Sequence, residues 1–368
     1  MKVCCIFNVA ALYRAPIFHL IDDSFDCDFY IGDDTGAPLK KMNYESLKGL
    51  KATLHNVRIG PFTWRKGYRE ACNKDYDTYI MTGEPNCITD WLVLIWARMH
   101  KKRTLLWCHG WYGKESLFAK IVKKIQYRLN SGLLLYGNRA YDLLVKEGVR
   151  KEKLFVIHNS LDYAKQLGIR KALQPSSLYA NHFGNDNKNI VFIGRLTSVK
   201  RFDLLIEAAS ILKSRGETVN ITFVGDGVER QNMESLVAER GLQKEVWFYG
   251  ACYDEQVNAE MIFNADLCVS PGNIGLTAMH VLMFGCPAIT NDDFSHQMPE
   301  FEAIKKNKTG DFFIAGDSTS LADTISSWFS LHKEDRDTVR QDCYKEIDDN
   351  WNPNYQIEIL KSAVPQPQ

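Results

Sequence analysis

The stretch Ala265–Thr290 constrains the fold more than any other part of the sequence. It contains a short apolar run, a turn with Gly272 and Gly275, an apolar-periodic run that ends at Gly285, and a second short apolar run. This order predicts a strand, a glycine-rich turn, a helix and a strand. Such a turn presents backbone N–H groups that suit an anionic ligand. An ordinary turn in a parallel sheet has the same pattern.

Two upstream segments have a related pattern. Asn189–Lys200 (NIVFIGRLTSVK) and Ile221–Gly227 (ITFVGDG) each contain an apolar strand that ends in glycine plus a charged residue, and a helical pattern such as Phe202–Ser214 follows. Ligands of open α/β sheets bind beyond the carboxyl ends of the strands, so we expect the three turns to converge. Arg195 and Lys200 would supply cationic donors there.

The first half of the chain alternates between strand and helix patterns. Helical periodicity occurs in Asp90–Met99 and Glu115–Leu129. The clearest strand candidates are Val3–Phe7, Phe29–Ile31, Tyr79–Met81, Thr104–Cys108, Gly132–Tyr136 and Leu154–Ile157. This alternation predicts an α/β fold with a parallel sheet covered by helices on both faces.

Four motifs occur in an order and at spacings that resemble retaining GT-B glycosyltransferases of family 4. They are G-R-L-x4-K, V-G-D-G, A-D-L-x-V-S-P and G-L-T-A-M-H-x4-G-C-P-A-I-T. The resemblance implies two Rossmann-like domains facing a central cleft. It also implies metal-independent transfer of a sugar from a nucleoside-diphosphate donor, a co-substrate, to a glycan or lipid-linked acceptor in cell-surface polysaccharide biosynthesis. No cofactor is expected.

The resemblance and a polar stretch rich in Ser, Asn and Asp divide the chain. The predicted parts are an acceptor-side domain over 1–173, a linker over 174–188, a nucleotide-sugar-binding domain over 189–345, and a crossover helix and tail over 346–368 that returns to the first domain. The linker and the crossing tail would form a hinge.

The resemblance also assigns the site residues. The catalytic candidates are His109, Arg195 and Lys200, and no metal ligand is expected. The donor-binding candidates are Gly194, Gly225, Asp226, Gly272, Asn273, Ile274, Gly275, Leu276, Thr277 and His280.

The sequence departs from the family at two places. Gly272 and His280 occupy the positions of the family's acidic pair, and the loop Asn8–Pro16 lacks the usual glycine-rich motif. A histidine can still hydrogen-bond a ribose hydroxyl, whereas glycine offers no side chain to a donor sugar. Either the donor sugar is held differently or transfer has been lost. The alternatives to a transferase are therefore a non-catalytic nucleotide-sugar-binding partner and a sugar-nucleotide epimerase on the same fold.

His109 follows the predicted strand L-L-W-C and matches a family histidine near the donor sugar. A purely structural histidine is the other interpretation. Trp111 and Tyr112 could form an aromatic platform for a sugar ring or pack in the interior.

The segment Lys114–Asn130 predicts a basic amphipathic helix. Such a helix can lie on an anionic membrane surface, or it can bury its apolar stripe on the sheet.

Composition limits the remaining classes. The formal net charge of zero argues against wholesale nucleic-acid binding. No apolar run reaches the roughly 20 residues of a membrane span. The ten cysteines include no C-x2-C pair, so we expect reduced thiols in a cytoplasmic protein, either free or peripheral at the inner membrane face.

Overall fold

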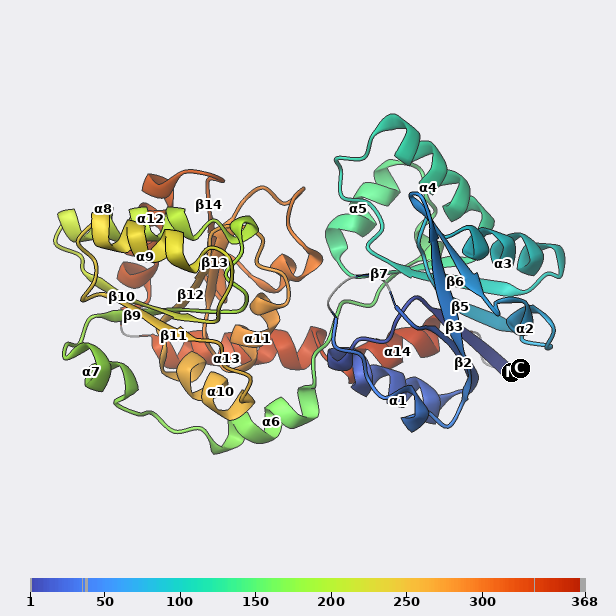
Figure 1. The fold of residues 1–368 in the computed structure, drawn as a ribbon, viewed down its shortest axis with the longest axis horizontal. Helices are drawn as coiled ribbons and strands as arrows, with labels where there is room; N and C mark the ends of the chain where they lie inside the picture. Colours follow the sequence, from blue (N-terminus) through green and yellow to red (C-terminus); the bar gives the residue numbers. More distant parts are fainter. Residues whose placement is uncertain (1, 35, 37–38, 334, 365–368) are drawn as a thin grey trace. The chain divides into compact units, whose positions relative to one another are not determined.

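The computed structural model describes residues 2–34, 36, 39–333 and 335–364 (Figure 1). The chain divides into two compact units, Met1–Tyr163 with Asn352–Gln368 (unit 1) and Ala164–Trp351 (unit 2). Each unit contains a largely or wholly parallel sheet with helices packed against it, which confirms the predicted α/β class.

The sheet of unit 1 has the strand order β4-β3-β2-β1-β5-β6-β7-β8. Its strands are β1 (Lys2–Phe7), β2 (Asp26–Gly32), β3 (Leu50–Ile59), β4 (Phe62–Lys66), β5 (Thr78–Thr82), β6 (Arg103–Cys108), β7 (Gly132–Leu135) and β8 (Leu154–Val156). Its helices are α1 (Ala15–Ser24), α2 (Arg69–Cys72), α3 (Ile88–Met99), α4 (Leu117–Leu129), α5 (Asn138–Lys146) and α14 (Pro353–Ala363). The sequence patterns did not predict the antiparallel hairpin β3–β4 at the sheet edge.

Alternation along β1 builds two cores in unit 1. Val3, Cys5 and Phe7 face a cluster that includes side chains of α1 and α14, and Cys4 and Ile6 face a cluster that includes α3 and α5. A central parallel strand covered on both faces requires this continuous apolar run. The cysteines of β1 are buried and free, as expected of small apolar side chains.

Unit 2 has a six-stranded parallel sheet with the order β11-β10-β9-β12-β13-β14. Its strands are β9 (Lys188–Ile193), β10 (Val219–Val224), β11 (Val246–Gly250), β12 (Leu267–Ser270), β13 (Ala288–Asn291) and β14 (Gly310–Phe313). Its helices are α6 (Tyr163–Ala172), α7 (Leu178–Phe183), α8 (Phe202–Ser214), α9 (Arg230–Glu239), α10 (Glu255–Asn264), α11 (Thr277–Met283), α12 (Ser318–Leu331) and α13 (Arg336–Asn350). Because β10, β9 and β12 are neighbours, their three carboxyl-terminal turns lie at one sheet edge, as predicted.

The unit boundaries differ from the predicted ones. Helix α6 lies within the predicted first domain (1–173) but belongs to unit 2, where Arg170 pairs with Asp348 at 2.8 Å. The predicted linker (174–188) contains α7, and the Tyr179 hydroxyl of α7 donates to the Met261 carbonyl at 2.7 Å. Both helices are therefore anchored to unit 2 by side-chain contacts that a polar composition does not reveal.

The C-terminal segment from Asn352 onward belongs to unit 1. Helix α14 packs against α1 (Figure 1), and the buried Gln356 donates to the His158 carbonyl at 3.0 Å and accepts from the Ser160 hydroxyl at 2.6 Å. The last helix is therefore part of the core of unit 1.

Candidate functional site

The turn that follows β12 is fixed by side chains from β13 and from the segment after it. The Gly272 carbonyl accepts hydrogen bonds from the side chains of Gln297, Thr290 and Asn291, each at 3.0–3.1 Å. Gln297 also accepts from the Ile274 N–H at 3.0 Å. These contacts hold the glycine-rich turn in one conformation.

Gly272 lies against the backbone of the turn that follows β9. Its N–H donates to the Lys200 carbonyl at 2.8 Å, and a Cβ atom at position 272 would lie 1.9 Å from the Val199 carbonyl oxygen. The absence of a side chain at Gly272 is therefore a packing requirement of this chain.

Lys200 is a half-buried cation beneath the same turn. Its Nζ donates to the carbonyls of Asn273 and Ile274, which leaves one of its three N–H donors for a ligand. Burial lowers the pKa of Lys200 to about 8, and the charge of Arg195 acts in the same direction. Arg195 is exposed and forms no ion pair with the described residues. The two cations are thus close enough to interact, and Glu300 opposes the effect of Arg195 on the pKa of Lys200.

The backbone amides of the turn fall into two groups. Those of Gly272, Asn273 and Ile274 are already engaged by Lys200, Val199 and Gln297. By contrast, the described chain provides no acceptor for the N–H groups of residues 275–277, which were also predicted to bind the donor. Of the backbone amides predicted to bind the donor, those of residues 275–277 therefore remain available to an anion.

The predicted glycines of the other two turns bring those turns together. Gly194 donates to the Val224 carbonyl at 3.0 Å, and a Cβ atom on Gly225 would lie 1.8 Å from the Gly194 oxygen. Asp226 is exposed and lies 3.8 Å from Arg230. The two glycines shape the sheet edge, and Asp226 presents a carboxylate there.

His280 of α11 is partly buried and faces an acid from another helix. Its Nε2 lies 3.0 Å from Oε1 of Glu255, which also accepts from the Gln166 side chain at 2.8 Å. Burial raises the pKa of Glu255, but hydrogen bonds from His280 and Gln166 outweigh it and hold the pKa below its usual value. The chain thus places a carboxylate beside His280 from a part of the sequence that the motifs did not include.

Unit 1 contains a pocket of about 1170 Å³ beyond the carboxyl ends of β1, β5 and β6. His109 lines this pocket, with its ring 4.7 Å from Tyr136 and 5.9 Å from Tyr112. Burial lowers the pKa of His109 to about 4, with smaller effects in the same direction from Arg14 and Lys123. At neutral pH the imidazole is therefore uncharged, with one donor and one acceptor nitrogen. Trp111, in contrast, is buried within the core.

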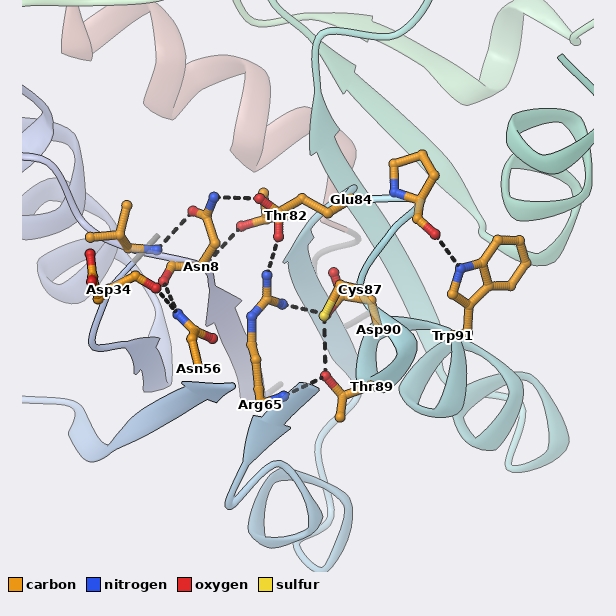
Figure 2. Close-up of polar contacts among 12 residues, drawn as sticks. Asn8, Asp34, Asn56, Arg65, Thr82, Glu84, Cys87, Thr89, Asp90 and Trp91 are labelled. Carbon is orange, nitrogen blue, oxygen red and sulfur yellow. Dashed lines mark hydrogen bonds and ion pairs between the residues drawn. The ribbon is translucent and has the colours of Figure 1, made fainter. Parts of the chain in front are cut away.

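One wall of this pocket is a network around the buried Arg65 (Figure 2). Its guanidinium bridges the carboxylates of Glu84 and Asp90, and Asn8 Nδ2 donates to the other Glu84 oxygen at 2.6 Å. Burial is the largest influence on the pKa of Asp90 and raises it, and Arg65 opposes that rise. The network fixes Glu84, which is partly exposed, at the pocket surface.

Glu84, Cys87 and Asp90 lie close enough to hold a metal ion. Arg65 already neutralises both acids, so this donor set does not fit a divalent cation well. The sequence also contains Asp-x-Asp motifs, which can bind a metal ion in other proteins. In one of them, Asp26-Cys27-Asp28, the buried Asp28 lies beside three lysines that neutralise its charge.

Helix α4 does not bury the apolar stripe that its sequence predicts. Leu117, Phe118, Ile121 and Ile125 are 76%, 77%, 50% and 47% exposed, whereas Gln126 and Tyr127 are the buried residues of the helix. The interpretation of α4 as an ordinary helix packed through this stripe is therefore wrong. An exposed apolar stripe of this kind is typical of an interaction surface.

The sequence motifs did not identify Gln297, Glu255, Arg65 or Arg14 as site residues. The first three contact partners that are distant in sequence, and Arg14 lies among aromatic rings. No local sequence pattern therefore identifies these residues. The only sequence signal near Arg14 is the unusual loop Asn8–Pro16 that replaces a glycine-rich motif.

The fold of the chain is GT-B. Structures with this arrangement cover nearly the whole chain: the Anabaena protein HepE in complex with UDP (TM-score 0.70, 15% identity, 98% of this chain and 99% of that one) and the apo lipopolysaccharide outer core galactosyltransferase WaaB (TM-score 0.72, 14% identity, 99% and 100%). At these identities the likeness concerns the fold.

The family model that matches the chain does so within unit 2. Residues 179–345 match the family model described as "Glycosyl transferases group 1". Over 246 residues the chain is 28% identical to EpsD of Bacillus subtilis (strain 168), a glycosyltransferase by name, covering 63% of this chain and 62% of EpsD. It is 30% identical over 114 residues to alpha-D-kanosaminyltransferase of Streptomyces kanamyceticus, covering 30% of this chain and 29% of that one. The chain thus spans less than two thirds of the length of these relatives.

Proposed function

We propose that this protein is a retaining glycosyltransferase that moves a sugar from a nucleoside-diphosphate donor to a glycan or lipid-linked acceptor in cell-surface polysaccharide biosynthesis. The observation that carries the proposal is the pair Lys200 and Arg195: Lys200 keeps a free N–H donor beside the Gly272 turn, and the exposed Arg195 forms no ion pair with the described residues. This pair lies within the segment that matches the glycosyltransferase model. Structural neighbours in complex with UDP or UDP-glucose support a nucleotide-sugar donor.

In the proposed reaction the bond between the anomeric carbon and the donor diphosphate breaks, and a bond to an acceptor hydroxyl forms. Lys200, Arg195 and the N–H groups of residues 275–277 would bind the departing diphosphate, because fixed donors aimed at developing charge lower the barrier. The leaving phosphate would take the acceptor proton. His280, supported by Glu255, would bind the ribose, and the uncharged His109 would hydrogen-bond the donor sugar.

The proposal is tested with the purified full chain and a panel of nucleotide-sugars. We expect slow release of free nucleoside diphosphate from one donor without an acceptor, and faster release once a suitable acceptor is added. Binding of donors without turnover across the panel, with or without acceptors, would favour the non-catalytic partner instead. Failure of every nucleotide to bind would contradict both functions.

The α4 surface supports a lipid-linked acceptor. The helix combines its exposed apolar residues with the exposed Arg128 and with Lys120 and Lys124, two cations that share the single carboxylate of Glu147. This excess of positive charge suits an anionic lipid surface. Phe118 and Val122 of the same helix line the pocket of unit 1. Among the described residues, no helix is both long and apolar enough to cross a bilayer. We therefore propose that α4 docks on an anionic membrane and brings the pocket beside the lipid-linked substrate.

Replacement of both Ile121 and Ile125 by serine should weaken binding to phosphatidylglycerol-containing vesicles about tenfold or more. The reason is that burying an isoleucine side chain in an apolar phase contributes roughly 1.5–3 kcal/mol. Neither residue lines the pocket, so acceptor-free donor hydrolysis should be unchanged. Vesicle co-sedimentation measures the effect. Val228→Ser, at an apolar residue of unit 2 that is more exposed than either isoleucine (81% against 50% and 47%), is the control. Equal losses in both variants would contradict docking through α4.

A further inference from the structure

Among the residues that the structure describes, a positively charged side chain in the pocket of unit 1 forms no ion pair. Arg14, which directly precedes α1, lines this pocket with its guanidinium carbon 4.6 Å from the centroid of the Trp107 ring. The rings of Phe18 and Tyr136 lie 5.3 Å and 6.0 Å from the same carbon. Aromatic rings thus surround the guanidinium and hold it in place.

The rings do not supply hydrogen-bond acceptors. Arg14 Nε and Nη2 are buried, and within the described residues neither has an acceptor. Arg65 in the same pocket is different, because it engages both Glu84 and Asp90. Glu84 is committed to Arg65 and Asn8, so it does not compensate Arg14. A desolvated charge without a partner is costly, and a bound anion would remove that cost.

Two further groups around Arg14 lack acceptors. Trp107 Nε1 and His109 Nδ1 are buried without a hydrogen-bond partner in the described chain, and both residues line the pocket. The indole nitrogen can only donate, and the uncharged imidazole can donate through one nitrogen. Arg14 and two neutral side chains that can donate hydrogen bonds, Trp107 and His109, therefore lie in one part of the pocket. The described chain provides no acceptor for these groups. The ligand group that complements them is an oxyanion.

We infer that the pocket of unit 1 contains an oxyanion site, in which Arg14, assisted by Trp107 and His109, binds a phosphate group of the acceptor. The choice of the acceptor as the source rests on the proposed function, because the acceptor is expected in this unit. The same chemistry would also suit a donor phosphate. The acceptor is thus assigned to the class of phosphate-bearing glycans and lipid-linked glycans.

The site itself is tested by NMR of the full chain with 15N-labelled tryptophan indoles. Trp107→Phe identifies the Trp107 Nε1–H resonance among those of the eight tryptophans. Titration with inorganic phosphate should shift this resonance saturably in the unmodified protein. Arg14→Gln should abolish the shift or weaken the apparent affinity at least tenfold, and Arg14→Lys should retain part of it. The other indole resonances report whether each variant remains folded.

Arg195→Gln is the matched control, because it removes a cation from unit 2 and should leave the phosphate response of Trp107 intact. No shift of Trp107 at saturating phosphate, or an equal shift in Arg14→Gln, would overturn the oxyanion site. If that happened while the protein still hydrolysed a nucleotide-sugar, the proposed function would stand alone. A retained shift without any donor turnover would instead overturn the function and leave the site.

Kinetics distinguish the two sources of the phosphate. If the acceptor supplies it, Arg14→Gln should raise the acceptor KM at least tenfold and leave the donor KM of acceptor-free hydrolysis unchanged. A rise in the donor KM without a rise in the acceptor KM would overturn the acceptor assignment and assign the site to the donor.

Discussion

Replacement of Gly272 by alanine should destabilise unit 2 by roughly 1–3 kcal/mol, the usual cost of forcing extra atoms into a packed interior. The new Cβ would meet the Val199 carbonyl oxygen at 1.9 Å, so the turns after β9 and β12 would have to separate. Because Lys200 donates to carbonyls of the same turn, donor affinity should fall with stability. Denaturant unfolding and nucleoside-diphosphate titration measure the two effects.

Gly168→Ala is the matched control. Gly168 lies in α6 of unit 2, a Cβ atom there would meet nothing within 4 Å, and alanine favours a helix. This variant should be neutral or slightly stabilised. Gly272→Glu, which introduces the family's acidic residue, should be at least as damaging as Gly272→Ala. A stable Gly272→Glu variant with increased transfer would show that glycine has replaced a catalytic acid at this position and is not required for packing.

Replacement of Lys200 by methionine should weaken nucleoside-diphosphate binding about ten- to a hundredfold at pH 7, since a charge-assisted hydrogen bond contributes roughly 1.5–3 kcal/mol. The unmodified protein should also lose affinity as the pH rises above about 8, because burial lowers the pKa of Lys200 to about that value and the amine then becomes uncharged. The loss should approach about tenfold per pH unit.

Calorimetric titration of nucleoside diphosphate from pH 6.5 to 9.5 measures this dependence. Lys200→Met should bind weakly with a nearly flat profile over the alkaline range, because the amine whose pKa lies near 8 has been removed. An alkaline loss of the same size in Lys200→Met would assign the dependence to another group. Unchanged affinity at pH 7 would remove Lys200 from the donor site.

The sequence predicts the elements whose signal is local. Phe202–Ser214 is a helix with the predicted bounds; β9 and β10 end directly before Gly194 and Gly225, and β12 ends at Ser270, two residues before Gly272. The hairpin β3–β4 was not predicted, because its strands are mostly exposed or half-buried and lack the continuous apolar run of the buried central strands. The domain boundary was misplaced because α6 is assigned by contacts such as Arg170–Asp348, which join residues far apart in sequence.

The candidate site shows the same division. The motifs place Arg195, Lys200 and the glycine turn at one sheet edge, because parallel strands deliver their carboxyl ends together. They do not reveal that the first amides of the turn are occupied, since Gln297 lies outside the motif. The motifs also do not reveal that the buried nitrogens of Arg14 lack an acceptor, because this depends on which side chains the fold brings near the guanidinium.

The insertion of unit 2 between two parts of unit 1 has a consequence for biosynthesis. Ile357, Leu360, Ala363 and Val364 belong to the buried cluster that also contains Val3, Cys5 and Phe7. A ribosome releases these partners at opposite ends of translation, so unit 2, which is continuous in sequence, can complete its core first. Helix α1 covers part of this apolar face early, but the rest stays uncovered until α14 emerges, and during that interval the nascent chain is most exposed to aggregation.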